Sequence, residues 1–183
     1  MIKLYKQNLC NQLIYREIWF DESKSCCFVH HGKVGYQGKI ESVKLNHFSE
    51  LESLFHDFEN RALAEDYAHF PVEKLVSVVV QYPLKSAMGS KRDLWLKEKA
   101  SEYLNQHLGW YGLGEVDGHD IGNKKLNIFC NVVDEDKAIS SIKSCLKTYR
   151  LDLGQALIAS RKPGDTAHTL RYAAKKIEDF TLI

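Results

Sequence analysis

The densest group of potentially reactive side chains in the sequence consists of Glu115, Asp117, His119 and Asp120. It lies in a glycine-rich stretch and holds three carboxylates and a histidine within six residues. In a strand, Glu115 and Asp117 would share one face, where paired carboxylates can bind a metal ion or act as general acid and base. The same residues suit a turn, because Asp side chains accept hydrogen bonds from nearby backbone amides. We expect a partner-binding hairpin loop over residues 117–123, and a metal-dependent enzyme is the alternative.

A second glycine-rich stretch runs from His31 to Gly38 and contains three glycines in eight residues. Strand-like runs flank it, at residues 26–29 and 40–45. Glycines at this density predict a turn whose backbone needs positive φ or close approach to another segment. Gly35 is the strongest candidate for such a conformation, and Gly32 is the next.

This stretch resembles the WGR domain, a family named for a Trp-Gly-Arg core that is followed by a turn, a strand and an amphipathic helix. Gly32, Val34, Gly35 and Gly38 fit the family's motif, with His31 at the Trp position and Lys33 at the Arg position. The resemblance covers roughly residues 1–70. It implies contact with DNA ends, with His31 stacking on a sugar and Lys33 near a phosphate. A histidine offers less stacking area than a tryptophan, and a lysine lacks the planar fork of an arginine.

Neither the cysteines nor the basic residues form a recognisable motif. The five cysteines contain no CxxC pair and no metal-ligand spacing, so they are expected to be reduced structural thiols. Basic doublets occur at Lys91-Arg92, Lys124-Lys125, Arg161-Lys162 and Lys175-Lys176. They could contact phosphates only if the fold brings them together. No cofactor is expected.

The first half of the chain predicts an antiparallel sheet followed by one helix. Strands are expected over residues 2–5, 13–20, 25–30 and 40–45. Ser49 and Glu52 form a capping box at the start of a helix that ends near His69. Its apolar face would comprise Leu51, Leu54, Phe55, Phe58 and Ala62. Pro71 marks the boundary of a WGR-like domain over residues 1–71.

The second half, residues 72–183, predicts a βαββαβ order and so resembles the ferredoxin-like fold. Strands are expected over residues 75–82, 110–116, 126–133 and 156–160, with helices over 90–108 and 134–149. Candidate core residues of the first helix are Leu94, Trp95, Tyr103 and Leu104. Residues 165–183 are ambiguous: Leu170, Ala173, Ala174 and Ile177 suggest a helical face, whereas residues 180–183 suggest a strand. The fold class is α+β.

Composition favours a protein that is neither membrane-bound nor a dedicated nucleic-acid binder. Residues 1–73 hold 8 Lys and Arg against 11 Asp and Glu, and residues 74–183 hold 17 against 13. Neither half has a strong basic excess. No apolar run approaches a membrane span, and the N-terminus lacks a signal peptide, so a cytoplasmic location is expected. The expected function is non-enzymatic recognition of a protein or nucleic acid, through residues His31, Gly32, Lys33, Gly35, Glu115, Asp117, His119 and Asp120. The main alternative is an immunity protein that neutralises a bacterial toxin with its acidic loop.

Overall fold

The computed structural model describes all residues except 46, 88, 176–179 and 183, and it divides into two compact units. The first unit comprises Met1–Pro71 with Trp110–Gly112, and the second comprises Val72–Gly109 with Leu113–Ile183. The expected α+β class is confirmed, because each unit combines an antiparallel sheet with helix. Among the described residues, no helix is both long and apolar enough to cross a membrane.

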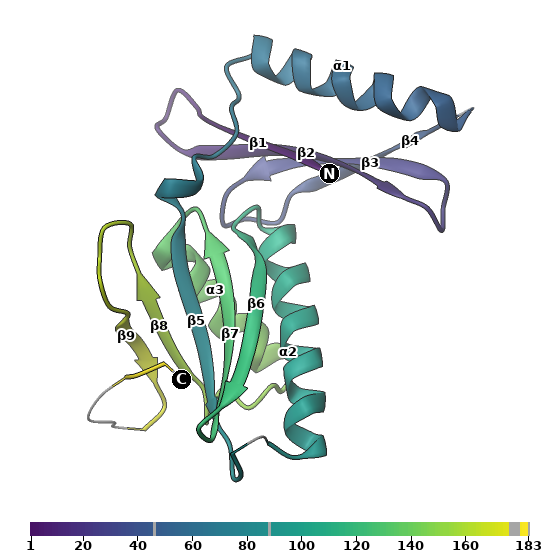
Figure 1. Ribbon diagram of the computed structural model, residues 1–183. Helices are drawn as coiled ribbons and strands as arrows, with labels where there is room; N and C mark the ends of the chain where they lie inside the picture. Colours follow the sequence, from purple (N-terminus) through teal and green to yellow (C-terminus); the bar gives the residue numbers. More distant parts are fainter. Residues whose placement is uncertain (46, 88, 176–179, 183) are drawn as a thin grey trace. The chain divides into compact units, whose positions relative to one another are not determined.

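The first unit is a four-stranded meander with one helix along one face (Figure 1). Its strands are β1 (Ile2–Gln7), β2 (Leu13–Asp21), β3 (Cys26–Lys33) and β4 (Lys39–Lys44). A short 3-10 helix, η1 (Phe48–Glu50), leads into α1 (Leu51–Ala64). Alternation in the strands places Leu4, Ile2 and Ile14 under this helix, where they pack with Phe58, Ala62 and Tyr67.

Two predictions about α1 are wrong. Glu50 is the N-cap residue, and no side chain caps the helix, so Ser49 and Glu52 do not form a capping box. A 3-10 hydrogen bond precedes the helix instead: the Glu50 amide donates to the carbonyl oxygen of His47. The helix also ends at Ala64 rather than near His69.

In the described part of the second unit, five antiparallel strands lie in the order β6-β7-β5-β8-β9 and are accompanied by two α-helices. After η2 (Val72–Lys74), the elements are β5 (Val76–Pro83), α2 (Lys91–Trp110), β6 (Gly114–Gly122), β7 (Lys125–Val132), α3 (Glu135–Thr148), β8 (Leu157–Arg161) and β9 (Thr169–Ala173). Ser90 and Asp134 begin the two helices, as expected: each oxygen accepts a backbone amide, from Asp93 and Lys137 respectively.

Helical spacing explains the core of the second unit. The residues of α2 that are buried recur every fourth position and are Leu96, Ala100, Leu104 and Leu108. The prediction that Leu104 is a core residue is therefore confirmed. The same prediction is wrong for Leu94 and Trp95, which are 45% and 50% exposed. In α3, Ala138, Ile142, Cys145 and Leu146 are buried. The face of β5 that includes Val78, Val80 and Tyr82 is also buried.

Three further predictions in the second unit are wrong. Trp110 ends a helix instead of starting a strand. Residues 117–123 are not a loop, because β6 continues to Gly122. Residues 169–173 form strand β9, paired with β8, so the helical face suggested for Leu170 and Ala173 is wrong. Ile177 lies outside the described residues.

Candidate functional site

The turn between β3 and β4 is shorter than the glycine-rich sequence from His31 to Gly38 suggests. Strand β3 continues to Lys33, so His31, Gly32 and Lys33 belong to the sheet and not to the turn. Gly35 has φ of +87°, a region that side chains with a Cβ rarely adopt, which confirms the expectation for that residue. Its amide donates to the carbonyl oxygen of Tyr111, 2.8 Å away and in the same unit.

Gly32 and Gly38 are required for space, not for positive φ. Gly32 lies opposite Tyr15 in the β2–β3 register. A Cβ on Gly38 would lie 2.2 Å from the Tyr15 hydroxyl oxygen and 2.3 Å from His30 Nε2. A Cβ on Gly32 would lie 2.9 Å from the Gly38 Cα. Both glycines therefore allow the fully buried ring of Tyr15 to pack beneath the turn.

The buried ring belongs to a polar row across three strands. Lys3, Glu17 and His30 lie opposite one another in register. Lys3 Nζ is 3.1 Å from Glu17 Oε2, and His30 Nδ1 is 2.6 Å from Glu17 Oε1. The Tyr15 hydroxyl lies 3.1 Å from His30 Nε2 and 3.3 Å from the Trp110 carbonyl oxygen. An ionised Glu17 can only accept, so His30 Nδ1 carries a proton and donates it.

Electrostatics supports an ionised Glu17. Burial alone would raise the pKa of Glu17, but the hydrogen bond from His30 and the charge of Lys3 hold that pKa below its ordinary value of 4.5. Burial also raises the pKa of Tyr15, which stays neutral. A Glu-His-Tyr chain could in principle transfer protons. Here Glu17, His30 and Tyr15 are 5%, 1% and 0% exposed, and this favours a structural role.

An accessible feature of the first unit is a groove between the sheet and α1, which we call the α1 groove. Its volume is about 390 Å³. Its apolar side chains are Ile18, Val29, Val43, Leu54, Phe58 and Ala62, and its charged or polar side chains are Arg16, His31, Glu41, Asp57, Arg61 and Glu65. One wall is formed by β4, an edge strand in which all six residues are exposed.

Of the four residues predicted to bind in this unit, only His31 lines the α1 groove. His31 Nε2 lies 3.6 Å from Glu41 Oε1 across the β3–β4 pair. Lys33 Nζ lies 4.5 Å from the centre of the Tyr36 ring, so it stacks on the neighbouring turn. Gly32 leaves room for Tyr15, and Gly35 has the positive φ of the turn; neither lines the groove. Sequence reasoning missed the other groove residues because their meeting depends on strand register and on the path of α1.

The acidic residues of the second unit lie along β6, at the edge of its sheet. Glu115, Asp117 and His119 are exposed at alternate positions, with a β-bulge between Val116 and Gly118. Asp120 is half-buried, and its Oδ1 has no hydrogen-bond partner among the described residues. Within that same part of the chain, no group of three or more His, Cys, Asp or Glu side chains could hold a metal ion. The turn after β6 is formed by Asn123 and Lys124, both with positive φ.

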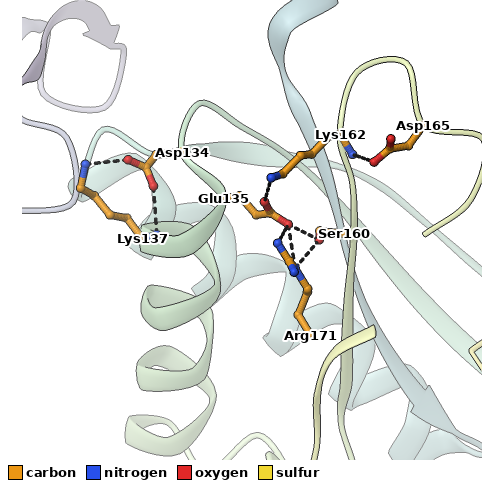
Figure 2. A network of polar contacts seen from close by, with 7 residues as sticks. All are labelled: Asp134, Glu135, Lys137, Ser160, Lys162, Asp165 and Arg171. Atoms are coloured by element: carbon orange, nitrogen blue, oxygen red, sulfur yellow. Dashed lines mark hydrogen bonds and ion pairs between the residues drawn. The ribbon is translucent and has the colours of Figure 1, made fainter. Parts of the chain in front are cut away.

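A further network of polar contacts centres on Glu135, which sequence reasoning did not single out (Figure 2). Its carboxylate accepts from Ser160 and from Arg171 Nε at 2.8 Å, and it lies 3.2 Å from Lys162 Nζ. Burial would raise the pKa of Glu135, but the hydrogen bonds from Ser160, Lys162 and Arg171 keep it below its ordinary value. The network ties the start of α3 to β8 and β9. Of the residues in this network, sequence reasoning named only Lys162, as part of the Arg161-Lys162 doublet.

The chain was compared with protein-family models, with curated proteins and with solved structures, and no match was found in any of the three.

Proposed function

We propose that the chain is a non-enzymatic, cytoplasmic recognition protein whose WGR-like first unit binds a protein partner in the α1 groove. The observation that carries this proposal is a groove with apolar lining, one wall of which is the edge strand β4, paired with β3 along one of its sides. An extended partner segment can add to such an edge through main-chain hydrogen bonds while one of its side chains fills the groove. The WGR-like assignment is supported by the β-meander followed by α1.

The charges around the α1 groove favour a protein partner over a nucleic acid. Arg16 is already paired with Glu65, at 2.8 Å. Glu41 and Asp57 would repel phosphates that approach the same groove. Because acidic, basic and apolar side chains all line the groove, it suits a polypeptide, which carries charges of both signs and apolar side chains.

We also propose a ferredoxin-like fold for the second unit. It is supported by the βαββαβ order of β5 to β8 and by the strand order β6-β7-β5-β8, to which β9 adds an edge. The fold does not indicate an activity, since such folds host unrelated functions.

A pair of substitutions on β4 tests the proposed function. Val43 and Ile40 are 36% and 42% exposed on the same edge strand, but only Val43 lines the α1 groove. Val43→Asp should abolish capture of the partner by the tagged chain, whereas Ile40→Asp should leave it unchanged. The captured protein would then be purified and titrated against both variants by calorimetry. Equal binding by the two variants would show that the groove is not the binding site.

A second candidate function, an immunity protein, is supported by the exposed acidic row on β6. Glu115 and Asp117 present carboxylates along a sheet edge, which could cover the basic active site of a toxin. Asp117→Lys should weaken such a complex. The matched control is Asp136→Lys, which makes the same change at an exposed position of α3. Binding that is lost with Asp117→Lys but kept with Val43→Asp would favour this candidate over the first.

A further inference from the structure

Three lysines meet at one cavity of the second unit, which we call the lysine pocket. The end of β5, the β6–β7 turn, the loop before β8 and the segment after β9 converge at one end of the sheet (Figure 1). Lys124, Lys125 and Lys175 line a cavity of about 250 Å³ there. Lys125 Nζ donates to the carbonyl and hydroxyl oxygens of Thr181, at 2.7 and 2.6 Å, so its position in the pocket wall is fixed by the C-terminal segment. We propose that the lysine pocket binds a small organic anion, with its oxyanion between Lys124 and Lys175 and a compact apolar body against the apolar part of the lining.

The part of the lysine pocket that the structure describes is lined by cations. Among the described residues that line it, none is Asp or Glu. Asp152, which lies in the loop before β8, is engaged by Arg92, with Arg92 Nη2 2.6 Å from Asp152 Oδ2. Among the described residues, no carboxylate lies within ion-pair distance of any of the three lysines. Three like charges around one cavity repel each other, and a bound anion relieves that repulsion.

The floor of the lysine pocket determines the kind of anion. Pro83, Ala156, Leu157 and Ala174 contribute apolar surface. A bare inorganic ion would leave this surface uncovered, whereas an aryl or short alkyl group would bury it. The cavity of about 250 Å³ is slightly smaller than typical ligand sites, which range from about 300 to 1,000 Å³, so the apolar body is about one ring in size. A phosphate monoester of that size has the required chemistry.

The backbone at Lys124 gives an independent indication. Asn123 and Lys124 have φ of 46° and 59°, as in the tight hairpin turns that favour Asn followed by Gly. The carbonyl oxygen of Lys124 accepts the Leu84 amide at 2.7 Å, which fixes the residue in this conformation. A lysine at this position is less stable than a glycine, so the fold accepts a local cost that places a cation at the pocket.

The experiment is an NMR titration of the full-length ¹⁵N-labelled chain with phenyl phosphate. Amide shifts are expected at residues 123–125, 154–157 and 174–175. Benzyl alcohol, which lacks the charge, and inorganic phosphate, which lacks the ring, should each bind at least about tenfold more weakly. Equal binding of benzyl alcohol, or shifts centred outside these residues, would overturn the proposal.

Lys124→Gly separates binding from stability. Glycine suits the turn, so the variant should be at least as stable as the wild type, yet its affinity for phenyl phosphate should fall about three- to tenfold. Lys175→Gln should weaken binding similarly, and Lys147→Gln, an exposed lysine of α3, should not. Wild-type affinity in Lys124→Gly would contradict the proposal. The result is independent of the α1 groove, which lies in the other unit.

Discussion

At the scale of single residues, the glycines of the first unit act mainly by making room. Gly38→Ala introduces a methyl group 2.2 Å from the Tyr15 hydroxyl oxygen and 2.8 Å from the His31 carbonyl oxygen. Neither the buried ring nor the strand can move away cheaply, so the variant should lose about 1–3 kcal/mol of unfolding free energy. Urea denaturation, followed by a probe in the first unit, measures this loss.

Ser42→Ala is the control for Gly38→Ala, because Ser42 is exposed on β4 of the same unit. We expect it to change the unfolding free energy by less than about 0.5 kcal/mol. If Gly38→Ala unfolded at the same urea concentration as Ser42→Ala, the polar row beneath the turn would not be as tightly packed as the distances indicate.

At the scale of elements, the Glu135 network should make the start of α3 sensitive to acid. A carboxylate with a lowered pKa stabilises the fold fully above its unfolded value, near 4.5, and this contribution is lost as the pH falls toward the folded pKa. Glu135→Gln should therefore cost about 1–2 kcal/mol at pH 7 and flatten the decline in stability below pH 5. Thermal unfolding at several pH values measures both effects.

Glu102→Gln is the control for the Glu135 network, because both side chains of the Lys99–Glu102 ion pair are nearly half exposed. Such a pair contributes little, so the variant should melt close to the wild type at pH 7. A Glu135→Gln variant with the same pH profile as the wild type would show that the network does not stabilise the folded chain.

The elements also show where sequence reasoning succeeds. Alternation and β-branched residues located β2, β5 and β7, because these patterns follow from burial of a strand face. The same reasoning failed at β6, where Asp117 and Gly118 favour a turn locally. An edge strand tolerates exposed charges because only one of its sides pairs, and β7 supplies that pairing.

The candidate sites were less predictable than the elements. The α1 groove depends on which residues of β2, β3 and β4 lie side by side, and the lysine pocket on four segments distant in sequence. Sequence periodicity gives the face of a strand but not its neighbour. The sequence therefore identified His31 and the lysine doublets as candidate contact residues, but it did not predict which other residues would lie beside them.

At the scale of the whole molecule, charge limits binding to nucleic acid. The chain carries a formal net charge of +1, divided into −3 for residues 1–73 and +4 for residues 74–183. Each phosphate contact adds about −0.9 to the slope of log affinity against log salt. Lys33 stacks on Tyr36, and His31 lies beside Glu41, so the resemblance to WGR domains supplies at most one or two such contacts.

We therefore expect a salt slope no steeper than about −2 for nicked duplex DNA, and weak affinity at physiological salt. Fluorescence anisotropy of a labelled nicked duplex, titrated at several salt concentrations, measures the slope, and Lys33→Ala should shift it by at most about one unit. Lys39→Ala, which removes an exposed lysine from β4, is the matched control. A slope of about −4 or steeper that Lys33→Ala weakens and Lys39→Ala does not would make nucleic acid, and not a protein, the ligand of the first unit. Because that slope counts phosphates directly, it distinguishes the two kinds of partner even before a natural ligand is identified.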